Sequence, residues 1–197
     1  SIFFLNSSIY AEDVISIKHV KNFDKLVVQD QLGRLKPVNT LSSEFLRKIY
    51  GKTEYRGFSS SQVVLGMIHN PVKWSKDSLI KVSHNDLRRL LGSDNFKSKY
   101  IRLSFNDFFD DNNNYILLDL AQKAHAKQPA KRSEYEKDII KVDERVNICF
   151  AIFNGGIFRF FPLKEDSNNT WLSSAENHRF SGLDSLFVSN IIPMYFK

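Results

Sequence analysis

The sequence predicts an α+β fold: one mostly helical domain over residues 1–197, with small β elements made of short strands. Three observations lead to this prediction. Apolar residues recur every three or four positions along several segments, which is typical of helices. Short apolar runs bounded by Gly, Pro, Asn or Asp lie between those segments and are typical of strands. With 197 residues, 42% of them hydrophobic and 25% charged, the chain can form one packed core.

A turn between two extended runs precedes the first predicted helix. Residues 25–38 predict two short strands around a turn at residues 30–33, and Pro37 limits the second strand. The helix that follows begins at a polar cap, Asn39 or Thr40. Its apolar face and its terminating glycine are Leu41, Phe45, Leu46, Ile49 and Gly51.

The middle of the chain predicts short elements in quick succession. Ser59 and Gln62 have the spacing of a capping box, and they start a helix that Pro71 ends. The next elements are, in order, a strand at residues 79–82, a helix from residues 83–86 to Gly92, a strand at residues 100–103, and a turn capped by Ser104 that carries Phe105, Phe108 and Phe109.

The longest predicted helix covers residues 133–153. Ser133 and Glu136 form a capping box at its start, and Gly155 and Gly156 end it. Its apolar stripe consists of Ile139, Val142, Val146, Cys149, Phe150 and Phe153. After it we expect a strand at residues 157–161 ending at Pro162, a loop at residues 166–169, and a last helix at residues 183–194.

No complete catalytic or metal-binding motif stands in the sequence. The loop at residues 110–114 has the Asp-x-Asn-x-Asn spacing of a calcium loop but lacks the required Gly and Glu, so we reject a calcium site. There is no phosphate-binding loop, no Gly-x-Ser-x-Gly elbow, and the five histidines are scattered. Asp143 and Glu144 lie off the apolar stripe, as solvated or paired charges do. We expect no catalytic residue and no metal ligand; a hydrolase assembled only in space stays open.

The charge of the chain suits an anionic partner. The net charge is +6 and the pI about 9.3, which fits nucleic acid, a lipid surface or a carboxylate-bearing ligand. Residues 157–164, IFRFFPLK, mix aromatic rings with Arg159 and Lys164, as sites for single-stranded nucleic acid do. The structural interpretation of the same run, which we favour, is a buried strand with Arg159 pointing outward.

The cysteine and the two ends of the chain give further expectations. A single cysteine, Cys149, excludes an intrachain disulfide, and its place on an apolar stripe predicts a buried thiol. No run reaches the roughly 18 apolar residues that a membrane span needs. Residues 1–5 and 185–197 are nevertheless apolar, either as core segments or as the stubs of membrane helices.

One stretch carries a family resemblance. Residues 25–49, KLVVQDQLGRLKPVNTLSSEFLRKI, resemble a segment of the system II cytochrome c biogenesis proteins, ResB/CcsA-like membrane proteins that transport haem and attach it. The positions that match are Leu26, Val28, Gln29, Gly33, Arg34, Lys36, Pro37, Thr40, Leu46, Arg47 and Lys48. Residues 60–74, 141–148 and 166–173 resemble the same group.

The resemblance implies a function outside the cytoplasm. That family joins the haem vinyl groups to the two thiols of a Cys-x-x-Cys-His motif in apocytochrome c, on the outer side of the cytoplasmic membrane. This chain would be the water-soluble periplasmic domain of a multi-pass membrane protein. Its partners would be apocytochrome c and the membrane-embedded remainder, and haem would belong to the parent protein.

The departures from the family limit which residues can be assigned. The tryptophan-rich haem-presenting loop is absent, and the family's haem ligands lie in or near membrane spans, so no catalytic or haem-ligating residue carries over. His19, the histidine nearest the matching segment, is a candidate haem or partner contact. Arg34, Lys36, Arg47 and Lys48 are candidates for contacts with a partner or lipid head groups; Arg47 and Lys48 also complement their helix end. The alternative function is a basic nucleic-acid-binding module.

Overall fold

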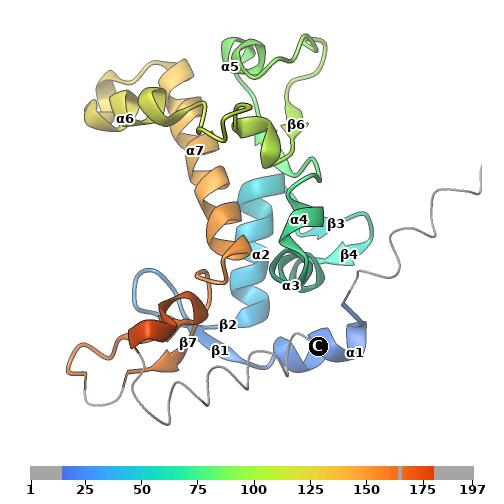
Figure 1. The fold of residues 1–197 in the computed structure, drawn as a ribbon, viewed down its shortest axis with the longest axis vertical. Helices are drawn as coiled ribbons and strands as arrows, with labels where there is room; N and C mark the ends of the chain where they lie inside the picture. Colours follow the sequence, from blue (N-terminus) through green and yellow to red (C-terminus); the bar gives the residue numbers. More distant parts are fainter. Residues whose placement is uncertain (1–14, 164–165, 180–197) are drawn as a thin grey trace, which may run out of the picture. The chain divides into compact units, whose positions relative to one another are not determined.

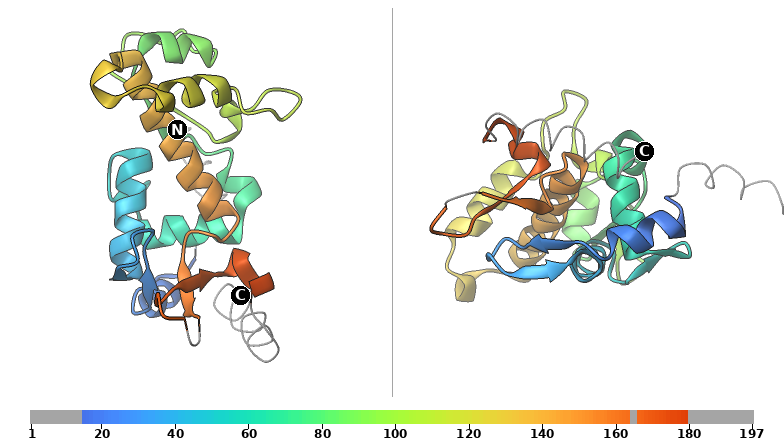
Figure 2. Two further views of the ribbon diagram at one scale, coloured as in Figure 1. Left: turned by 90° about the vertical axis from the view of Figure 1, so that its left-hand side faces the viewer. Right: turned by 90° about the horizontal axis from the view of Figure 1, so that it is seen from below.

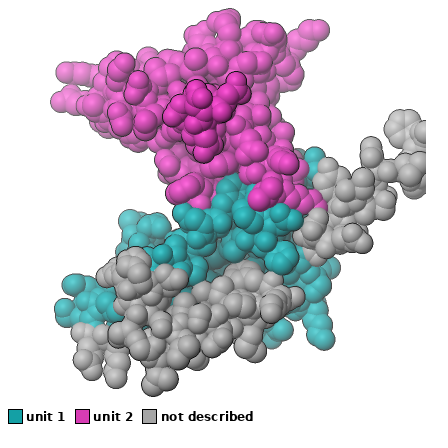
Figure 3. Space-filling view, viewed as in Figure 1, with its two compact units in different colours: residues 1–46, 52–71, 151–197 teal, residues 47–51, 72–150 magenta. Residues whose placement is uncertain are grey.

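The computed structural model describes residues 15–163 and 166–179, and its helices and small sheets confirm the predicted α+β class (Figure 1). The chain divides into two compact units (Figure 3). The first consists of residues 1–46, 52–71 and 151–197, and the second of residues 47–51 and 72–150. Each unit is assembled from segments that lie apart in the sequence, a division that composition and periodicity do not reveal.

The first unit is built around a four-stranded antiparallel sheet with the strand order β2-β1-β7-β8. β1 (Val27–Gln29) and β2 (Leu35–Pro37) form the predicted hairpin, and Figure 2 shows them in blue beside β7 in orange. The other strands are β7 (Arg159–Pro162) and β8 (Trp171–Ser173). The remaining elements are α1 (Ile17–Phe23), the first part of α2 (Val38–Tyr50), β3 (Glu54–Tyr55), β4 (Phe58–Ser59), α3 (Ser60–His69) and the 3-10 helix η3 (Ser174–Arg179).

Aromatic rings hold the core of the first unit together. Phe23 of α1 and Phe158 are at most 2% exposed, and their ring centroids lie 5.6 Å apart in an edge-to-face arrangement. Phe45 of α2 approaches Phe158 at 6.1 Å. Full burial of such a side chain stabilises a fold by about 1.5–3 kcal/mol, so this cluster fastens α1 and α2 to the segment that leads into β7.

The second unit pairs β5 (Ile80–Val82) with β6 (Ile101–Leu103) in antiparallel register. Between them in sequence lies α5 (Asn85–Leu90), capped by His84, whose Nδ1 accepts a hydrogen bond from the Asp86 N–H at 3.2 Å. The remaining elements are α4 (Pro71–Trp74), the 3-10 helices η1 (Asn106–Phe108) and η2 (Pro129–Lys131), α6 (Leu118–Ala126) and most of α7 (Glu134–Phe153). Ile80, Leu87, Phe108, Leu117 and Val142 are fully buried here.

A buried arginine organises the loop after α5. Arg88 is 1% exposed, and its Nη1 donates to the carbonyl oxygens of Ser98 at 2.8 Å and Asn95 at 3.4 Å. Its Nη2 donates to the carbonyl oxygen of Lys99. A buried charge is costly unless it is hydrogen-bonded, and here the carbonyls of one loop accept from both terminal nitrogens, Nη1 and Nη2. Arg88 therefore fixes residues 95–99 against α5.

Both predicted capping boxes are confirmed. At α3, the Gln62 N–H donates to Ser59 Oγ at 3.3 Å, and the Ser59 N–H donates to Gln62 Oε1 at 3.0 Å. At α7, Ser133 and Glu136 make the same reciprocal pair at 3.2 and 2.9 Å. The hairpin, the strands near residues 80 and 101 and the helix after His84 are confirmed as well, and β7 begins two residues later than predicted.

The predicted start of α2 is wrong. The helix begins at Val38, so Asn39 and Thr40 lie inside its first turn and neither caps it. The Val38 N–H instead donates to the carbonyl oxygen of Leu26 at 3.0 Å. Because the residue just before β1 satisfies this first donor, the chain passes from β2 into α2 without a polar cap.

Three other local predictions need correction. Phe150, placed on the buried stripe of α7, is 58% exposed. Pro71 does more than end α3, because it is the first residue of α4. Ser104 does not cap the following turn with its side chain; its N–H donates to the carboxylate of Asp107 at 2.7 Å, and η1 has no side-chain cap.

Several elements were not predicted at all. These are α1, α6, β8 and the hairpin of β3 and β4, whose turn residues Arg56 and Gly57 have φ angles of 50° and 82°. The apolar ends and the helix expected at residues 183–194 lie outside the described residues. Among residues 15–163 and 166–179, no helix has the length and apolar character that crossing a membrane requires.

Candidate functional site

The stretch that carries the family resemblance is centred on a buried carboxylate, Asp30. It is 6% exposed and occupies the turn between β1 and β2. Its Oδ1 accepts hydrogen bonds from the N–H groups of Leu32 at 2.8 Å and Arg34 at 2.9 Å. Its Oδ2 lies 2.9 Å from Arg34 Nη2, 3.0 Å from Arg34 Nε and 3.2 Å from Lys36 Nζ. The turn is therefore fixed by one carboxylate that binds two backbone donors and two cations.

Hydrogen bonds affect the pKa of Asp30 more than its burial does. Burial alone would raise the pKa of Asp30, but the N–H groups of Arg34 and Leu32 and the side chains of Lys36 and Arg34 hold that pKa well below its usual range. Asp30 is accordingly a permanent negative charge in the folded protein. Such a group positions the turn and does not exchange protons near neutral pH.

Gln29, next to Asp30, joins two of the family-like stretches. It is 5% exposed, and its Nε2 donates to the carbonyl oxygens of Gly33 at 3.2 Å and Asn169 at 2.9 Å. Its Oε1 accepts from the Trp171 N–H at 2.9 Å. The structure thus brings residues 25–49 and 166–173, about 140 positions apart, into contact within the first unit.

The same loop geometry occurs three times. Asp30, Asp110 and Asp166 each accept hydrogen bonds from the N–H groups two and four residues later. The residue three positions after each has a positive φ: Gly33 at 81°, Asn113 at 62° and Asn169 at 52°. Glycine and asparagine tolerate that region best. The acidic loop at residues 110–114 is therefore a turn of this kind, which explains its spacing without calcium.

The predicted surface cations differ in their surroundings. The Arg34 side chain is 62% exposed while it pairs with Asp30. The Lys36 side chain is only 17% exposed and lies between Asp30 and Glu44, 2.7 Å from Glu44 Oε2. In the second unit, Lys48 pairs with Glu144, and each side chain is 49% exposed. The structure therefore brings Arg34 and Lys36 together around one carboxylate, and Lys36 is held on both sides.

Arg47 and His19 complete the set of predicted contact residues. Arg47 is exposed in the last turn of α2. His19 lies on α1, is half-buried, and its N–H donates to the capping Ser16 Oγ at 3.3 Å. A haem or partner contact of His19 stays a prediction.

The aromatic run at residues 157–163 is mostly part of the core. Phe158 is 2% exposed, and its ring lies 5.5 Å from that of Phe160, which lies 6.2 Å from Phe161. Arg159 donates to Gln31 Oε1 at 3.3 Å across the sheet. Bases stack on the exposed faces of aromatic rings, whereas Phe160 and Phe161 are half-buried and pack at tilted or edge-on angles within this cluster. The arrangement supports the interpretation as a structural strand.

Sequence reasoning did not find a polar cluster around Asp143. This carboxylate accepts hydrogen bonds from the Tyr115 hydroxyl at 3.0 Å and Asn147 Nδ2 at 3.2 Å, and His125 Nε2 lies 3.3 Å away. Burial raises the pKa of Tyr115, and the charge of Asp143 raises it further. Asp143 is thus a paired structural charge, as predicted, that joins the segment around α6 to α7. Over the described residues, no group of three or more His, Cys, Asp or Glu side chains could hold a metal ion.

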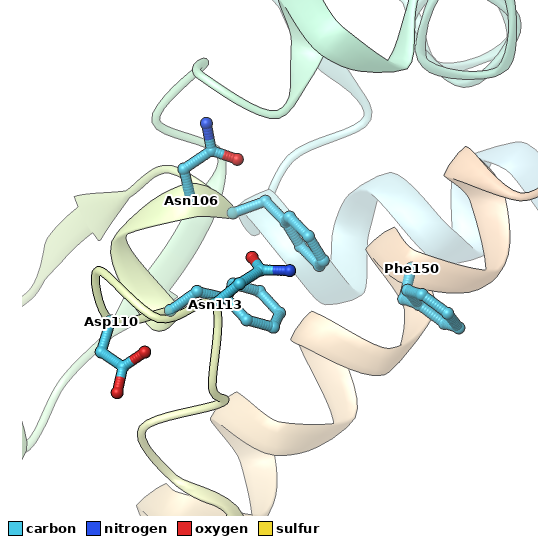
Figure 4. Close-up of a pocket in the computed structure, with 6 residues that line it drawn as sticks. Asn106, Asp110, Asn113 and Phe150 are labelled. Carbon is cyan, nitrogen blue, oxygen red and sulfur yellow. The ribbon is translucent and has the colours of Figure 1, made fainter.

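The second unit also contains an open pocket of about 410 Å³ (Figure 4). Its lining comes from the turn around η1, the loop that follows it, and one residue of α7. The lining residues are Phe105, Asn106, Phe109, Asp110, Asn113 and Phe150. Figure 4 shows Asn113 extending toward α7, which carries Phe150. The pocket is an aromatic surface with a polar rim.

Comparison with known proteins identifies a relative of part of the chain. The chain is 42% identical over 157 residues to the protein NrfI of Wolinella succinogenes. The match covers 80% of this chain and 17% of NrfI, so the chain spans less than a fifth of that relative. No protein-family model matches the chain.

Proposed function

We propose that this chain is a non-catalytic extracytoplasmic domain of a cytochrome c biogenesis protein. It would support the delivery of haem and its covalent attachment to apocytochrome c. The observation that carries the proposal is the similarity to NrfI over 80% of the chain, which supports a role in cytochrome c maturation. The family-like pattern at residues 25–49 is consistent with the same role.

The contacts within that pattern favour a supporting role over chemistry. Asp30 is saturated by turn donors, and Gln29 is saturated by the Gly33, Asn169 and Trp171 backbone. Side chains that satisfy one another have little capacity left for a substrate. We infer that the pattern builds a stiff sheet edge. Arg34, Arg47 and Lys48 are then the exposed candidates for a partner or lipid head groups, and Lys36 positions the turn.

The parent protein would supply what this domain lacks. We infer that it contains the membrane spans and the haem site, and that the domain lies on the periplasmic side. The length of NrfI, of which the match covers 17%, is compatible with such a larger protein. We further propose that the parent protein is a ResB/CcsA-like polypeptide in which haem transport and haem attachment are fused.

A maturation assay tests the proposal directly. The parent protein, with and without residues 15–179, is expressed in a bacterium that lacks its own haem attachment system, together with a reporter cytochrome c. Haem-stained gels report covalent haem, and immunoblots of membranes report the amount of parent protein. We expect the deletion to abolish covalent haem while the parent protein remains in the membrane. Unchanged haem attachment would refute a supporting role.

Two binding measurements separate the alternatives. A haem titration of the 197-residue chain and of His19→Ala, followed by absorbance, tests the His19 contact; no haem band, or the same band in both, excludes it. Binding of single-stranded DNA and RNA at low salt tests the nucleic-acid alternative, because phosphate contacts are strongest there. We expect no binding, since the aromatic rings of residues 157–161 pack on one another.

A further inference from the structure

The pocket of the second unit exposes aromatic surface. Phe150 is 58% exposed, although it stands on a helix whose neighbouring positions Cys149 and Ile152 are buried. Phe105 and Phe109 form the other wall, with ring centroids 4.9 Å apart. Aromatic side chains in an open hollow are characteristic of surfaces that bind a large apolar group.

The chain around this pocket is acidic, although the whole protein is basic. Residues 103–122 contain four aspartates and no lysine or arginine, whereas the net charge of the protein is +6. Asp110 lines the pocket, and Asp111 beside it is exposed. Hydrogen bonds from Asn114 and Asn112 lower the pKa of Asp110, so its negative charge persists at neutral pH. Positive charge on a ligand should therefore increase its affinity for this surface.

The lining residues exclude several ligand classes. Haem iron requires a His, Met, Cys or Tyr ligand, and none of the six lining residues is of these types. Nucleic acid requires cations for its phosphates, and here the charged residue is an aspartate. A volume of about 410 Å³ lies near the lower end of small-ligand pockets, and suits one or two side chains.

We propose that this pocket binds an extended, basic peptide segment that presents a large apolar side chain. The apolar side chain inserts between Phe150 and the pair Phe105 and Phe109, and flanking Lys or Arg residues lie beside Asp110 and Asp111. The amides of Asn106 and Asn113 are available at the rim for the peptide backbone. This inference goes beyond the proposed function and does not depend on it.

Fluorescence anisotropy with defined peptides tests the proposal. The probe is a short fluorescein-labelled peptide with one Trp between two Lys-Arg pairs, titrated with the 197-residue chain at low salt. Saturable binding is expected at about 10–100 μM, in the range of weak peptide recognition. The same peptide with Trp replaced by Ser, or with its cations replaced by Glu, should bind at least about tenfold more weakly.

Matched variants locate the site. Phe150→Gln should weaken binding about tenfold, whereas Leu118→Gln, which changes a similarly exposed apolar side chain outside the pocket, should not. Asp111→Lys should weaken binding, whereas Asp94→Lys, an exposed aspartate elsewhere in the same unit, should not. Circular dichroism confirms that each variant is folded.

Three results would overturn the proposal. They are the absence of saturable binding, equal binding of the acidic peptide, and unchanged affinity of Phe150→Gln. Sedimentation velocity tests whether a second copy of the chain occupies the pocket instead. If the chain self-associates and Phe150→Gln abolishes that association, the proposed peptide partner is wrong.

Discussion

Replacing Asp30 by Asn tests whether the family-like turn is held by one charge. The substitution preserves size, and an amide oxygen can still accept from the N–H groups of Leu32 and Arg34. It removes the charge at Oδ2 and places an NH2 group against Arg34 and Lys36. A hydrogen bond to a charged group contributes about 1.5–3 kcal/mol, but the bonds to the exposed Arg34 side chain count for less. We expect Asp30→Asn to lower the free energy of unfolding by about 2–3 kcal/mol at pH 7.

The pH dependence of this difference follows from the lowered pKa of Asp30. A carboxylate whose pKa is lower in the folded state stabilises the fold above its unfolded pKa, about 3.9, and loses that contribution as the pH falls toward its folded pKa. At pH 3 the native Asp30 stays ionised, while an unfolded aspartate is about 90% protonated. The wild type therefore loses about 1.3 kcal/mol between pH 7 and pH 3 that the Asn variant does not lose.

Urea unfolding at both pH values measures these quantities, with tryptophan fluorescence and circular dichroism as independent probes. Asp110→Asn is the matched control, because Asp110 makes the same two backbone contacts at an exposed loop and has no cation pair among residues 15–163 and 166–179. Asp110→Asn should lower the free energy of unfolding at pH 7 clearly less than Asp30→Asn does. Two results would refute the electrostatic explanation of the turn. One is an Asp30→Asn variant as stable as the wild type at pH 7. The other is a difference in free energy of unfolding between the two proteins that is no smaller at pH 3 than at pH 7.

Three more predictions concern single residues. Gly33→Ala should cost about 1 kcal/mol in urea unfolding because φ is 81° there, and Gly33→Asn should cost less, since Asn113 and Asn169 hold the same position in the equivalent loops. Arg88→Met should cost about 2–4 kcal/mol and expose residues 95–99 to limited proteolysis; resistance equal to the wild type would contradict its anchoring role. Cys149, 1% exposed with a pKa raised by burial, should react with a thiol reagent only after unfolding in urea.

The structure could be predicted from sequence where the cause is local. A capping box needs residues three positions apart, and both Ser59 with Gln62 and Ser133 with Glu136 form as expected. The turn at residues 30–33 combines an aspartate with a residue three positions later that tolerates a positive φ, here Gly33. The start of α2 failed for the opposite reason, because its first donor is satisfied by Leu26, which lies twelve positions earlier and pairs through the hairpin.

Phe150 shows how a small departure from periodicity carries information. The other members of the predicted stripe follow steps of three and four, but Phe150 follows Cys149 by one. One step rotates a side chain by about 100° around a helix, which moves Phe150 out of the buried face. Ile152, three residues after Cys149, continues that face and is fully buried. The step of one is the signal in the sequence for an exposed Phe150, which the predicted stripe assigns to the core.

Contacts between segments far apart in the sequence could not be predicted from the sequence alone. Gln29 reaches Asn169 and Trp171, and Asp143 gathers Tyr115 and His125 from 28 and 18 positions away. None of these residue types is unusual at its position. Such pairs depend on how the chain folds back on itself, which no local pattern encodes.

Four residues of the family-like pattern, Gln29, Gly33, Arg34 and Lys36, have a structural cause in the first unit. Gly33 supplies the positive φ of the turn, Arg34 and Lys36 neutralise the buried Asp30, and Gln29 ties the hairpin to residues 169–171. A pattern explained in this way identifies a domain by its architecture. It does not locate a reaction. Surfaces that distinguish one function from another are then to be sought at residues that no internal contact explains, such as the exposed Phe150, which lines a pocket together with the acidic loop.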